Sequence, residues 1–361
     1  MIERENIKIW QMPQIQEWLM EGDPAIRWQT LRDLIGADQK TVEQERQRVA
    51  EQGWGARLLA LQEPSGRWGG GMYGPKWIST HYTMLTLRQI GLAPGHPQAL
   101  KACQVMIDRG FFTDGGINFF SKAWKYSETC VTGMVLSILA WFHFTDPRLD
   151  RIVEYLLDQQ MPDGGWNCES YKGATHSSFH TTISVLEGLA EYCRFIQEHG
   201  NGIGEMADEI QTRVSSSQAR AHEFLLTHRL FRSHRTGEVI DNRMLRFPFP
   251  PRWKYDVLRA LDYFQGIDQP GTGKRGSGDK GKGIGEKGSE EGVETKIRLQ
   301  GDERFKEAIE LVRKKRKLDG RWVMAQGMSG RIYFDLEKAG EPSRWNTLRA
   351  LRVLKWWEGE R

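Results

Sequence analysis

Histidine and cysteine recur at one position of a repeated segment of this chain. When THYTMLTL, TCVTGMVLSIL and FHTTISVLEGL are superposed on their leucines, His81, Cys130 and His180 fall together, about one repeat apart. Glu128 stands two residues before Cys130. Thiolate, imidazole and carboxylate are the side chains that bind zinc in proteins. The alignment therefore predicts a place where such groups meet. The alternative is that the cysteine is simply buried and that each histidine bonds to backbone.

A second set of possible ligands follows the next turn of the chain. Cys168 comes just after Trp166, and His176 and His180 are four residues apart. Two such histidines share a face if the helix begins before both of them. The alternative is a loop that carries an incidental histidine.

Arginine followed by tryptophan precedes three of the apolar helices that we expect, at Arg27, Arg252 and Arg344. Helix N-termini present free N–H groups and a positive dipole, so this end of the molecule would suit a diphosphate headgroup. The alternative is that these arginines pair with carboxylates or stack on their tryptophans. The candidate ligand-binding side chains at this end are His81, Tyr82, Trp124, Arg252, Trp253, Tyr255, Asp256, Arg344 and Asn346.

A seven-residue pattern, Gln-x-x-x-Gly-x-Trp, separates the helices. It occurs at Gln62–Trp68 and Gln160–Trp166, and in degraded form at Arg316–Trp322, while residues 113–117 keep only its glycines. Glycine supplies a turn that other residues resist. We expect the tryptophan to pack back over this turn and its indole N–H to meet a free carbonyl at the end of the preceding helix.

The helices around these turns are of two kinds. Those that enter a turn, at 97–109, 148–160 and 303–315, have one apolar stripe, whereas those that leave it, at 83–90, 132–142 and 182–189, are apolar around most of the circumference. The apolar helices begin near Ile26, Thr80, Thr129, Phe179, Trp253 and Trp345. Six inner helices with outer helices between them predict an all-α fold, an (α/α)6 toroid. An ordinary helical bundle or an open solenoid is the alternative.

With QEPSGRW, QQMPDGGW and FHTTISVLEGL, the chain resembles the superfamily of terpenoid cyclases, such as squalene–hopene cyclase, and protein prenyltransferases. The resemblance spans nearly the whole chain except residues 266–296. It implies the toroid and a central, aromatic-lined cavity that binds or transforms an isoprenoid or another long apolar ligand. The pattern specifies the superfamily better than the activity.

The resemblance also implies a metal site. Protein prenyltransferases hold zinc with Asp-x-Cys at one inner helix and a histidine at a later one, and Glu128, Cys130 and His180 match these positions. Zinc would activate a thiol by lowering its pKa. Three features depart from the family: glutamate replaces aspartate, the cysteine and the histidine are only one repeat apart, and the partner α subunit is not part of this chain.

Triterpene cyclisation is not expected. The cyclases protonate an alkene with an acid in a DxDD-type motif, which this chain lacks. Asp114 and Asp163 fall in the glycine turns, where aspartate normally stabilises local backbone.

Composition restricts the class of protein further. A net charge of +4 from 51 basic and 47 acidic residues does not indicate a nucleic-acid-binding surface. Four cysteines are too few for a secreted disulfide framework, which predicts a cytoplasmic protein. No run approaches the roughly twenty apolar residues of a membrane-spanning helix, although peripheral membrane contact stays open. The Gly- and Lys-rich residues 266–296 predict a disordered insertion in a single domain of residues 1–361.

Three function classes remain. The first is an enzyme or binder that takes a prenyl-type or other apolar small molecule into the aromatic-lined lumen. The second is a scaffold or interaction protein that keeps the toroid without chemistry. The third, a sugar-processing (α/α)6 enzyme, needs two lumen carboxylates at catalytic separation, and only Asp256 and Glu128 stand at such positions.

Overall fold

The computed structural model describes residues 8–120, 124–199, 204–268 and 299–359, and of residues 204–208 only the backbone. Thirteen α-helices carry most of these residues. The strands that accompany them are short: β1 (Trp322–Val323) pairs antiparallel with β2 (Pro342–Ser343), with Trp322 opposite Ser343. The prediction of an all-α protein is confirmed.

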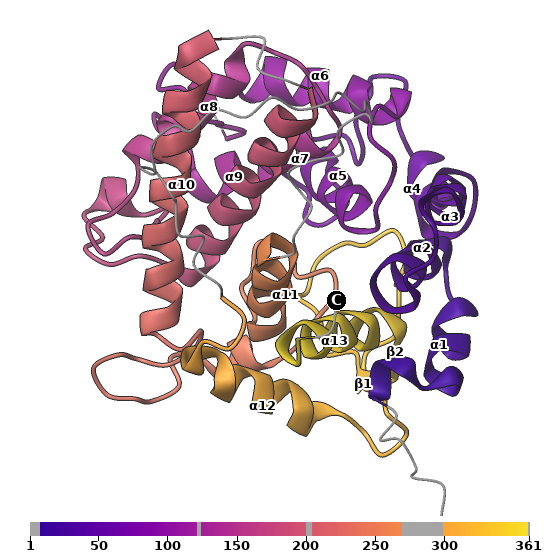
Figure 1. Cartoon of the computed structure of the whole chain (residues 1–361). Helices are drawn as coiled ribbons and strands as arrows, with labels where there is room; N and C mark the ends of the chain where they lie inside the picture. Colours follow the sequence, from indigo (N-terminus) through magenta and orange to yellow (C-terminus); the bar gives the residue numbers. More distant parts are fainter. Residues whose placement is uncertain (1–7, 121–123, 200–203, 269–298, 360–361) are drawn as a thin grey trace, which may run out of the picture.

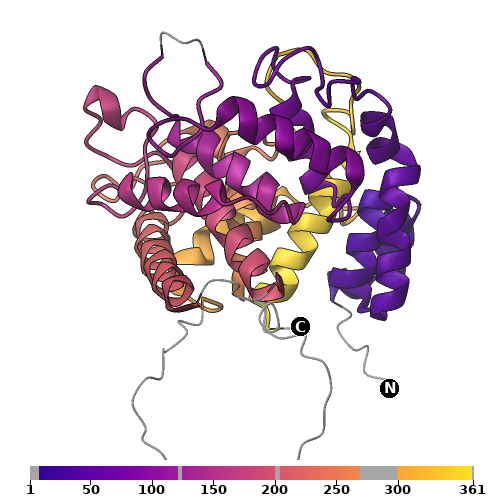
Figure 2. The same ribbon diagram turned by 90° about the horizontal axis from the view of Figure 1, so that it is seen from above.

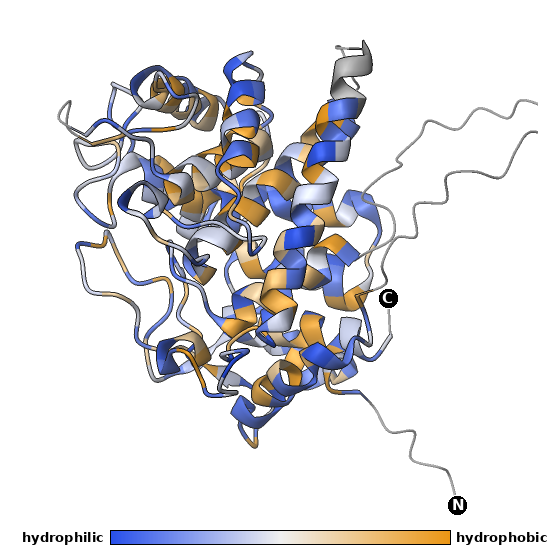
Figure 3. Ribbon diagram, turned by 90° about the vertical axis from the view of Figure 1, so that its left-hand side faces the viewer, coloured by the Kyte–Doolittle hydropathy of each residue, from blue (hydrophilic) through white to orange (hydrophobic). Residues whose placement is uncertain are grey.

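Helices form near all six positions where the sequence predicts inner helices, and further helices lie between them along the chain. Of these six, Val257–Asp268 and Arg344–Trp357 lie toward the middle of the view in Figure 1. The inner helices are α2 (Pro24–Thr30), α5 (Thr80–Gln89), α7 (Thr129–Trp141), α9 (Phe179–His199), α11 (Val257–Asp268) and α13 (Arg344–Trp357). Residues 129–140 of α7 are all buried, as its apolar circumference predicts. The outer helices are α1 (Pro13–Met20), α3 (Gln39–Glu51), α4 (Gly53–Leu59), α6 (Pro97–Gly110), α8 (Arg148–Asp158), α10 (Gly204–Thr227) and α12 (Lys306–Lys315). Polar and apolar residues alternate along the helices on the side of α8 and α10, as expected for helices with one solvent-facing side (Figure 3).

Neighbouring inner helices contact each other in the order α5, α7, α9, α11, α13 and α2. The two ends of this series are also joined, because the Trp28 indole after the start of α2 donates to the Ile90 carbonyl at the end of α5, at 3.1 Å. Figure 2 shows the N-terminal helices, drawn in indigo, beside α13, drawn in yellow. The loop before α5 also contacts the loop before β2, because the backbone N–H of Trp77 donates to the Arg331 carbonyl at 2.6 Å.

The tryptophans of the repeated turns do what the sequence predicts. The indole N–H groups of Trp68, Trp166 and Trp322 each donate to a carbonyl ten residues earlier, at 2.7, 2.7 and 2.8 Å. All three side chains are fully buried. In the two complete copies, Gln62 and Gln160 close the turn by donating to the carbonyls of Gly66 and Gly164.

The structure corrects the repeat register at His81. A threonine hydroxyl accepts the backbone N–H of the turn residue in each repeat: Thr80 from Trp68, Thr132 from Ile117 and Thr182 from Trp166. Counting back two residues from these threonines gives Ile78, Cys130 and His180, so His81 is not equivalent to the other two. Helix α5 begins at its threonine, whereas α7 and α9 begin three residues before theirs. A slip of three residues keeps the leucines on one helix face, so the leucine alignment does not detect it.

Two predicted boundaries also move. Helix α11 starts at Val257 and not near Trp253, because Arg252 adopts a left-handed conformation (φ 58°) and Asp256 then accepts the Arg259 N–H at 2.9 Å. The same helix runs to Asp268, three residues into the predicted insertion. The remainder of residues 266–296 lies outside the described residues.

Within the described ranges, none of the helices combines the length and apolarity needed to span a membrane.

Candidate ligand-binding site

Aromatic side chains gather where the inner helices begin. Tyr82 of α5 packs against Tyr73 and Trp77, with ring centroids 5.2 and 4.7 Å apart. The Trp124 ring continues the cluster toward Tyr171, at 5.5 Å. We call this cluster the aromatic mouth; its members are Tyr73, Trp77, His81, Tyr82, Phe119, Phe120, Trp124 and Tyr171.

His81 is fully buried in the aromatic mouth, and neither ring nitrogen has a hydrogen-bond partner in the described part of the chain. Burial, helped by the nearby Lys76 cation, lowers the His81 pKa to about 3, so the imidazole is neutral. The hydroxyl of Tyr82 meets that of Tyr73, and burial raises the pKa of both phenols. Neutral polar groups inside an aromatic wall can orient a ligand without repelling its apolar part.

Arg252 stands beside this wall without an anionic partner. Its guanidinium donates to the Thr86 hydroxyl of α5 at 3.2 Å and lies 5.5 Å from the centroid of the Trp77 ring. No carboxylate of the described residues forms an ion pair with it, and burial lowers its pKa to about 10. Lys76 adds a second cation, 5.6 Å from the Trp77 ring and 5.9 Å from the Trp253 ring. The two cations make this end of the molecule receptive to an anion.

The arginines of the other two Arg-Trp pairs are occupied. Arg27 donates to Glu45 at 2.6 Å, and Arg344 donates to the Trp18 carbonyl at 2.7 Å and pairs with Glu21 at 3.2 Å. For Arg27 and Arg344, the alternative that the arginine pairs with a carboxylate is confirmed. Arg252 is therefore the distinctive member of the series.

Trp253, Tyr255 and His180 form a small group next to Arg252. The His180 and Trp253 rings meet edge to face at 5.3 Å, and the Tyr255 N–H donates to His180 Nδ1 at 2.9 Å. The Tyr255 hydroxyl donates to the Leu230 carbonyl at 2.6 Å. The Trp253 indole N–H has no partner among the described residues. Tyr255 is thus a structural residue here, whereas Trp253 offers a free donor.

Asp256 and Asn346 each keep one free oxygen in a buried position. Asp256 Oδ1 caps α11, but Oδ2 has no partner in the part of the chain that the structure describes. Burial raises the Asp256 pKa to about 6, although Arg349 and Arg259 act in the opposite direction. The Asn346 amide donates to the Phe247 carbonyl at 2.7 Å, and its Oδ1 is unpartnered in the described ranges.

The predicted zinc ligands do not converge in this geometry. Glu128, Cys130 and His180 do not bring three ligand atoms within 4.8 Å of one another in the described chain. The His180 Nδ1 is taken by Tyr255, and the Cys130 thiol instead meets Cys168. As placed in the described chain, these three side chains do not form a zinc site like that of the prenyltransferases, and zinc binding by them stays a prediction.

Cys130 and Cys168 come from the two candidate sets and form a pair of thiols. Cys168 Sγ accepts the Cys130 backbone N–H at 3.1 Å, at the start of α7, and the Thr181 hydroxyl at 3.4 Å. The hydrogen bond from the Cys130 thiol lowers the Cys168 pKa, and the same contact together with burial raises the Cys130 pKa. Cys168 is the thiol of the pair that ionises first.

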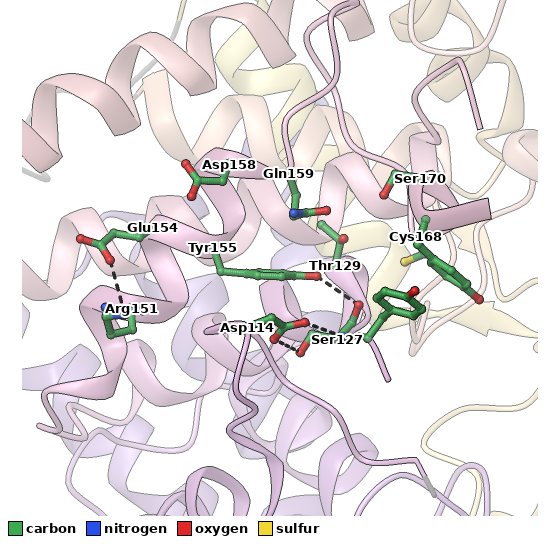
Figure 4. A pocket seen from close by; sticks show the side chains of 12 residues that line it. Asp114, Ser127, Thr129, Arg151, Glu154, Tyr155, Asp158, Gln159, Cys168 and Ser170 are labelled. Carbon is green, nitrogen blue, oxygen red and sulfur yellow. Dashed lines mark hydrogen bonds and ion pairs between the residues drawn. The ribbon is translucent and has the colours of Figure 1, made fainter. Parts of the chain in front are cut away.

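Cys168 also lines a pocket of about 270 Å³ between α8, the start of α7 and the loops that contain Asp114 and Cys168 (Figure 4). The Asp114 carboxylate in this pocket accepts from the Ser127 hydroxyl at 2.7 Å and from its N–H at 2.9 Å. Asp163 makes the same two bonds to Ser177 in the next turn. The prediction that these aspartates stabilise their turns is confirmed, and the pocket wall holds no free acid at Asp114.

A larger pocket, about 890 Å³, lies between α9, α10 and the loop that follows α10. His176 and His180 both line it, but α9 begins at Phe179, after His176, so the early helix start that would place both on one helix face does not occur. Sequence reasoning missed two further histidines there, His228 and His234, whose ring nitrogens are 2.9 Å apart. These two follow α10 and belong to no repeat, so the repeat gave no signal for them.

Sequence analysis also missed an ion-pair network deeper among the inner helices. Arg259 of α11 donates to both oxygens of Glu187 of α9, each at 2.8 Å. Arg88 of α5 donates to Glu191 of α9, at 2.8 Å. We call this set the deep network; its members are Arg88, Glu187, Glu191, Arg194, Arg259, Asp262, Arg349, Arg352 and Asp33. Charged residues within helices that are otherwise apolar could have indicated this network.

A scan against protein-family models and a search of the curated proteins found no match to this chain.

Proposed function

We propose that the chain forms a closed double ring of helices and binds an amphiphilic isoprenoid, or a similar apolar molecule with an anionic head, at the aromatic mouth. The contact between α2 and the end of α5 supports closure, because it joins the first and last members of the inner series. The resemblance of the repeats to terpenoid cyclases and prenyltransferases supports the ligand class.

The observation that carries the proposal is that the Arg252 guanidinium has no carboxylate partner in the described chain. A guanidinium that is drawn out of water without a carboxylate is costly. Its left-handed backbone adds strain of about 1–2 kcal/mol. An anionic head such as a diphosphate would offset both costs by accepting hydrogen bonds from Arg252 and by lying near Lys76. The aromatic rings beside them would cover the apolar tail.

The deep network limits the length of that tail. Its arginines and carboxylates are paired across α5, α9, α11, α13 and residues near α2, so the inner helices carry charge and not apolar wall at this level. We therefore expect affinity to rise with the number of isoprene units and then to stop rising, in contrast to a lumen that is apolar throughout.

The test is calorimetric titration with a series of prenyl diphosphates, with inorganic diphosphate and the matching prenyl alcohols as partial ligands. Prenyl diphosphates should bind more tightly than either part alone. Arg252→Gly should lower the affinity at least tenfold without loss of stability, because glycine adopts φ 58° freely. Arg344→Gln is the matched control, since Arg344 belongs to the same Arg-Trp pattern but pairs with Glu21.

Two results would contradict the proposal. Equal affinity of Arg252→Gly and the wild-type protein for the prenyl diphosphates would remove Arg252 from the site. Absence of binding by every apolar ligand would leave the scaffold as the favoured function. The sugar-processing alternative gains nothing from the deep carboxylates, because Glu187, Glu191 and Asp262 are all paired with arginines.

A further inference from the structure

Three potential metal ligands meet where α7 and α9 end, away from the aromatic mouth. His143 follows α7, and Glu198 and His199 close α9. One ligand atom from each lies within 4.8 Å of the other two, and the described residues contain no other such group of histidine, cysteine or carboxylate ligands. We propose that His143, Glu198 and His199 bind one divalent transition-metal ion of the nitrogen- and oxygen-preferring class, such as Zn²⁺, Co²⁺ or Ni²⁺.

The distances suit such an ion. Zinc lies about 2.0–2.2 Å from nitrogen and oxygen ligands, so tetrahedral ligand atoms are separated by about 3.3 Å. His143 Nε2 and Glu198 Oε2 are 3.2 Å apart. The rings of His143 and His199 meet nearly perpendicular, with centroids 4.4 Å apart. Because Glu198 and His199 are exposed, small rotations of their side chains can bring all three atoms to ligand distance.

A hydrogen bond to backbone leaves one ring nitrogen of His199 available for ligation. His199 Nδ1 donates to the Phe195 carbonyl at 2.9 Å, which leaves the lone pair of Nε2 for a metal.

His143 also occupies a position that favours glycine. It follows the last turn of α7 with φ 54°, whereas the corresponding residues after α5 and α13 are Gly91 (φ 85°) and Gly359 (φ 82°). Glycine is the usual residue there because a side chain strains a left-handed backbone. The imidazole therefore lowers the stability of the helix end that it completes. The negative end of the α7 dipole and the Glu198 carboxylate both stabilise a cation at this place.

The experiment uses the full chain without a histidine tag and titrates it with CoCl₂ and, separately, ZnCl₂. We expect one equivalent of cobalt, with visible d–d absorption and no thiolate-to-cobalt charge-transfer band. His199→Ala and His143→Gly should each lower the affinity at least tenfold. His143→Gly should also leave the metal-free melting temperature unchanged or higher, while abolishing its increase on addition of zinc.

Matched controls separate this site from the other candidate ligands. His176→Ala removes an exposed histidine elsewhere and should leave cobalt binding unchanged. Binding that is insensitive to His143→Gly and His199→Ala would overturn the proposal. A thiolate band that Cys130→Ser abolishes would overturn it as well, since it would place the metal at the predicted zinc position. The proposal does not depend on prenyl binding, so either can fail without the other.

Discussion

The aromatic mouth and the deep network lie among the same inner helices but differ in whether their arginines are paired with carboxylates. In the deep network each arginine has a carboxylate partner, as Arg259 has Glu187. In the aromatic mouth, His81 keeps both ring nitrogens unpartnered, and Arg252 beside it has no carboxylate partner in the described chain. Buried polar groups are normally satisfied.

The difference separates structure from function. Paired charges connect neighbouring helices and fix their register, whereas unpaired polar atoms lower stability unless a ligand completes them. The deep network is therefore expected to hold these helices together, and the aromatic mouth is expected to recognise a ligand. Substitutions in the two regions should then act in opposite directions on stability.

The largest effect is expected in the deep network. Glu187→Gln leaves the buried Arg259 guanidinium without its charged partner, which should lower the free energy of unfolding by about 3 kcal/mol. Chemical denaturation followed by circular dichroism measures the change. Glu358→Gln is the control, because its pair with Lys8 lies at the surface and contributes less than about 1 kcal/mol. Equal effects of the two substitutions would show that the network does not stabilise the inner helices.

An effect of opposite sign, and at most as large, is expected for Asp256→Asn. Burial raises the Asp256 pKa from 3.8 to about 6, so the folded state binds more protons than the unfolded state between these pH values. Stability from this group is therefore lost as pH rises through that window. Asparagine can still cap α11 and is neutral. It should have little effect near pH 4 and should stabilise the protein above pH 6, by up to about 3 kcal/mol.

Unfolding by denaturant at pH 4 and pH 7 tests this prediction, with Asp319→Asn as the control at an exposed turn. Destabilisation by Asp256→Asn at pH 7 would mean that Arg349 fully compensates the buried charge. The contrast between the two regions would then disappear at Asp256.

The sequence predicted those features that repeat. Trp68, Trp166 and Trp322 reach their expected carbonyls because a glycine turn and a buried indole leave few other arrangements. The starts of α5, α7 and α9 were also found, because apolar periodicity changes sharply there. By contrast, the shift of His81 relative to Cys130 is not visible in a pattern of period 3.6, because residues three apart share a face.

The sequence did not show which carboxylate each arginine would pair with. Arg252 and Arg344 have the same local signature, yet only Arg344 reaches a carboxylate, because Glu21 of the N-terminal part lies beside α13. Glu187 and Arg259 are likewise brought together by the packing of α9 against α11 and not by spacing along the chain. Long-range pairs of this kind need the packing of the helices to be known first.

The smallest expected effect concerns the alkylation rates of two half-buried thiols, one near the start of α7 and one next to the deep network. Cys168 lies beside the start of α7, where the Cys130 N–H and thiol and the Thr181 hydroxyl lower its pKa. Cys193 lies on α9 next to the deep network, and burial raises its pKa to about 11. Only thiolates react with iodoacetamide, so Cys168 should be alkylated several-fold faster than Cys193 near pH 7.5. Peptide mass mapping of a labelling time course measures both rates in one sample.

The substitution Cys130→Ala removes the thiol donor, so it should slow the alkylation of Cys168 without changing that of Cys193. Faster labelling of Cys193 than of Cys168 would contradict the prediction, because it would show that the region next to the deep network is more accessible than the start of α7.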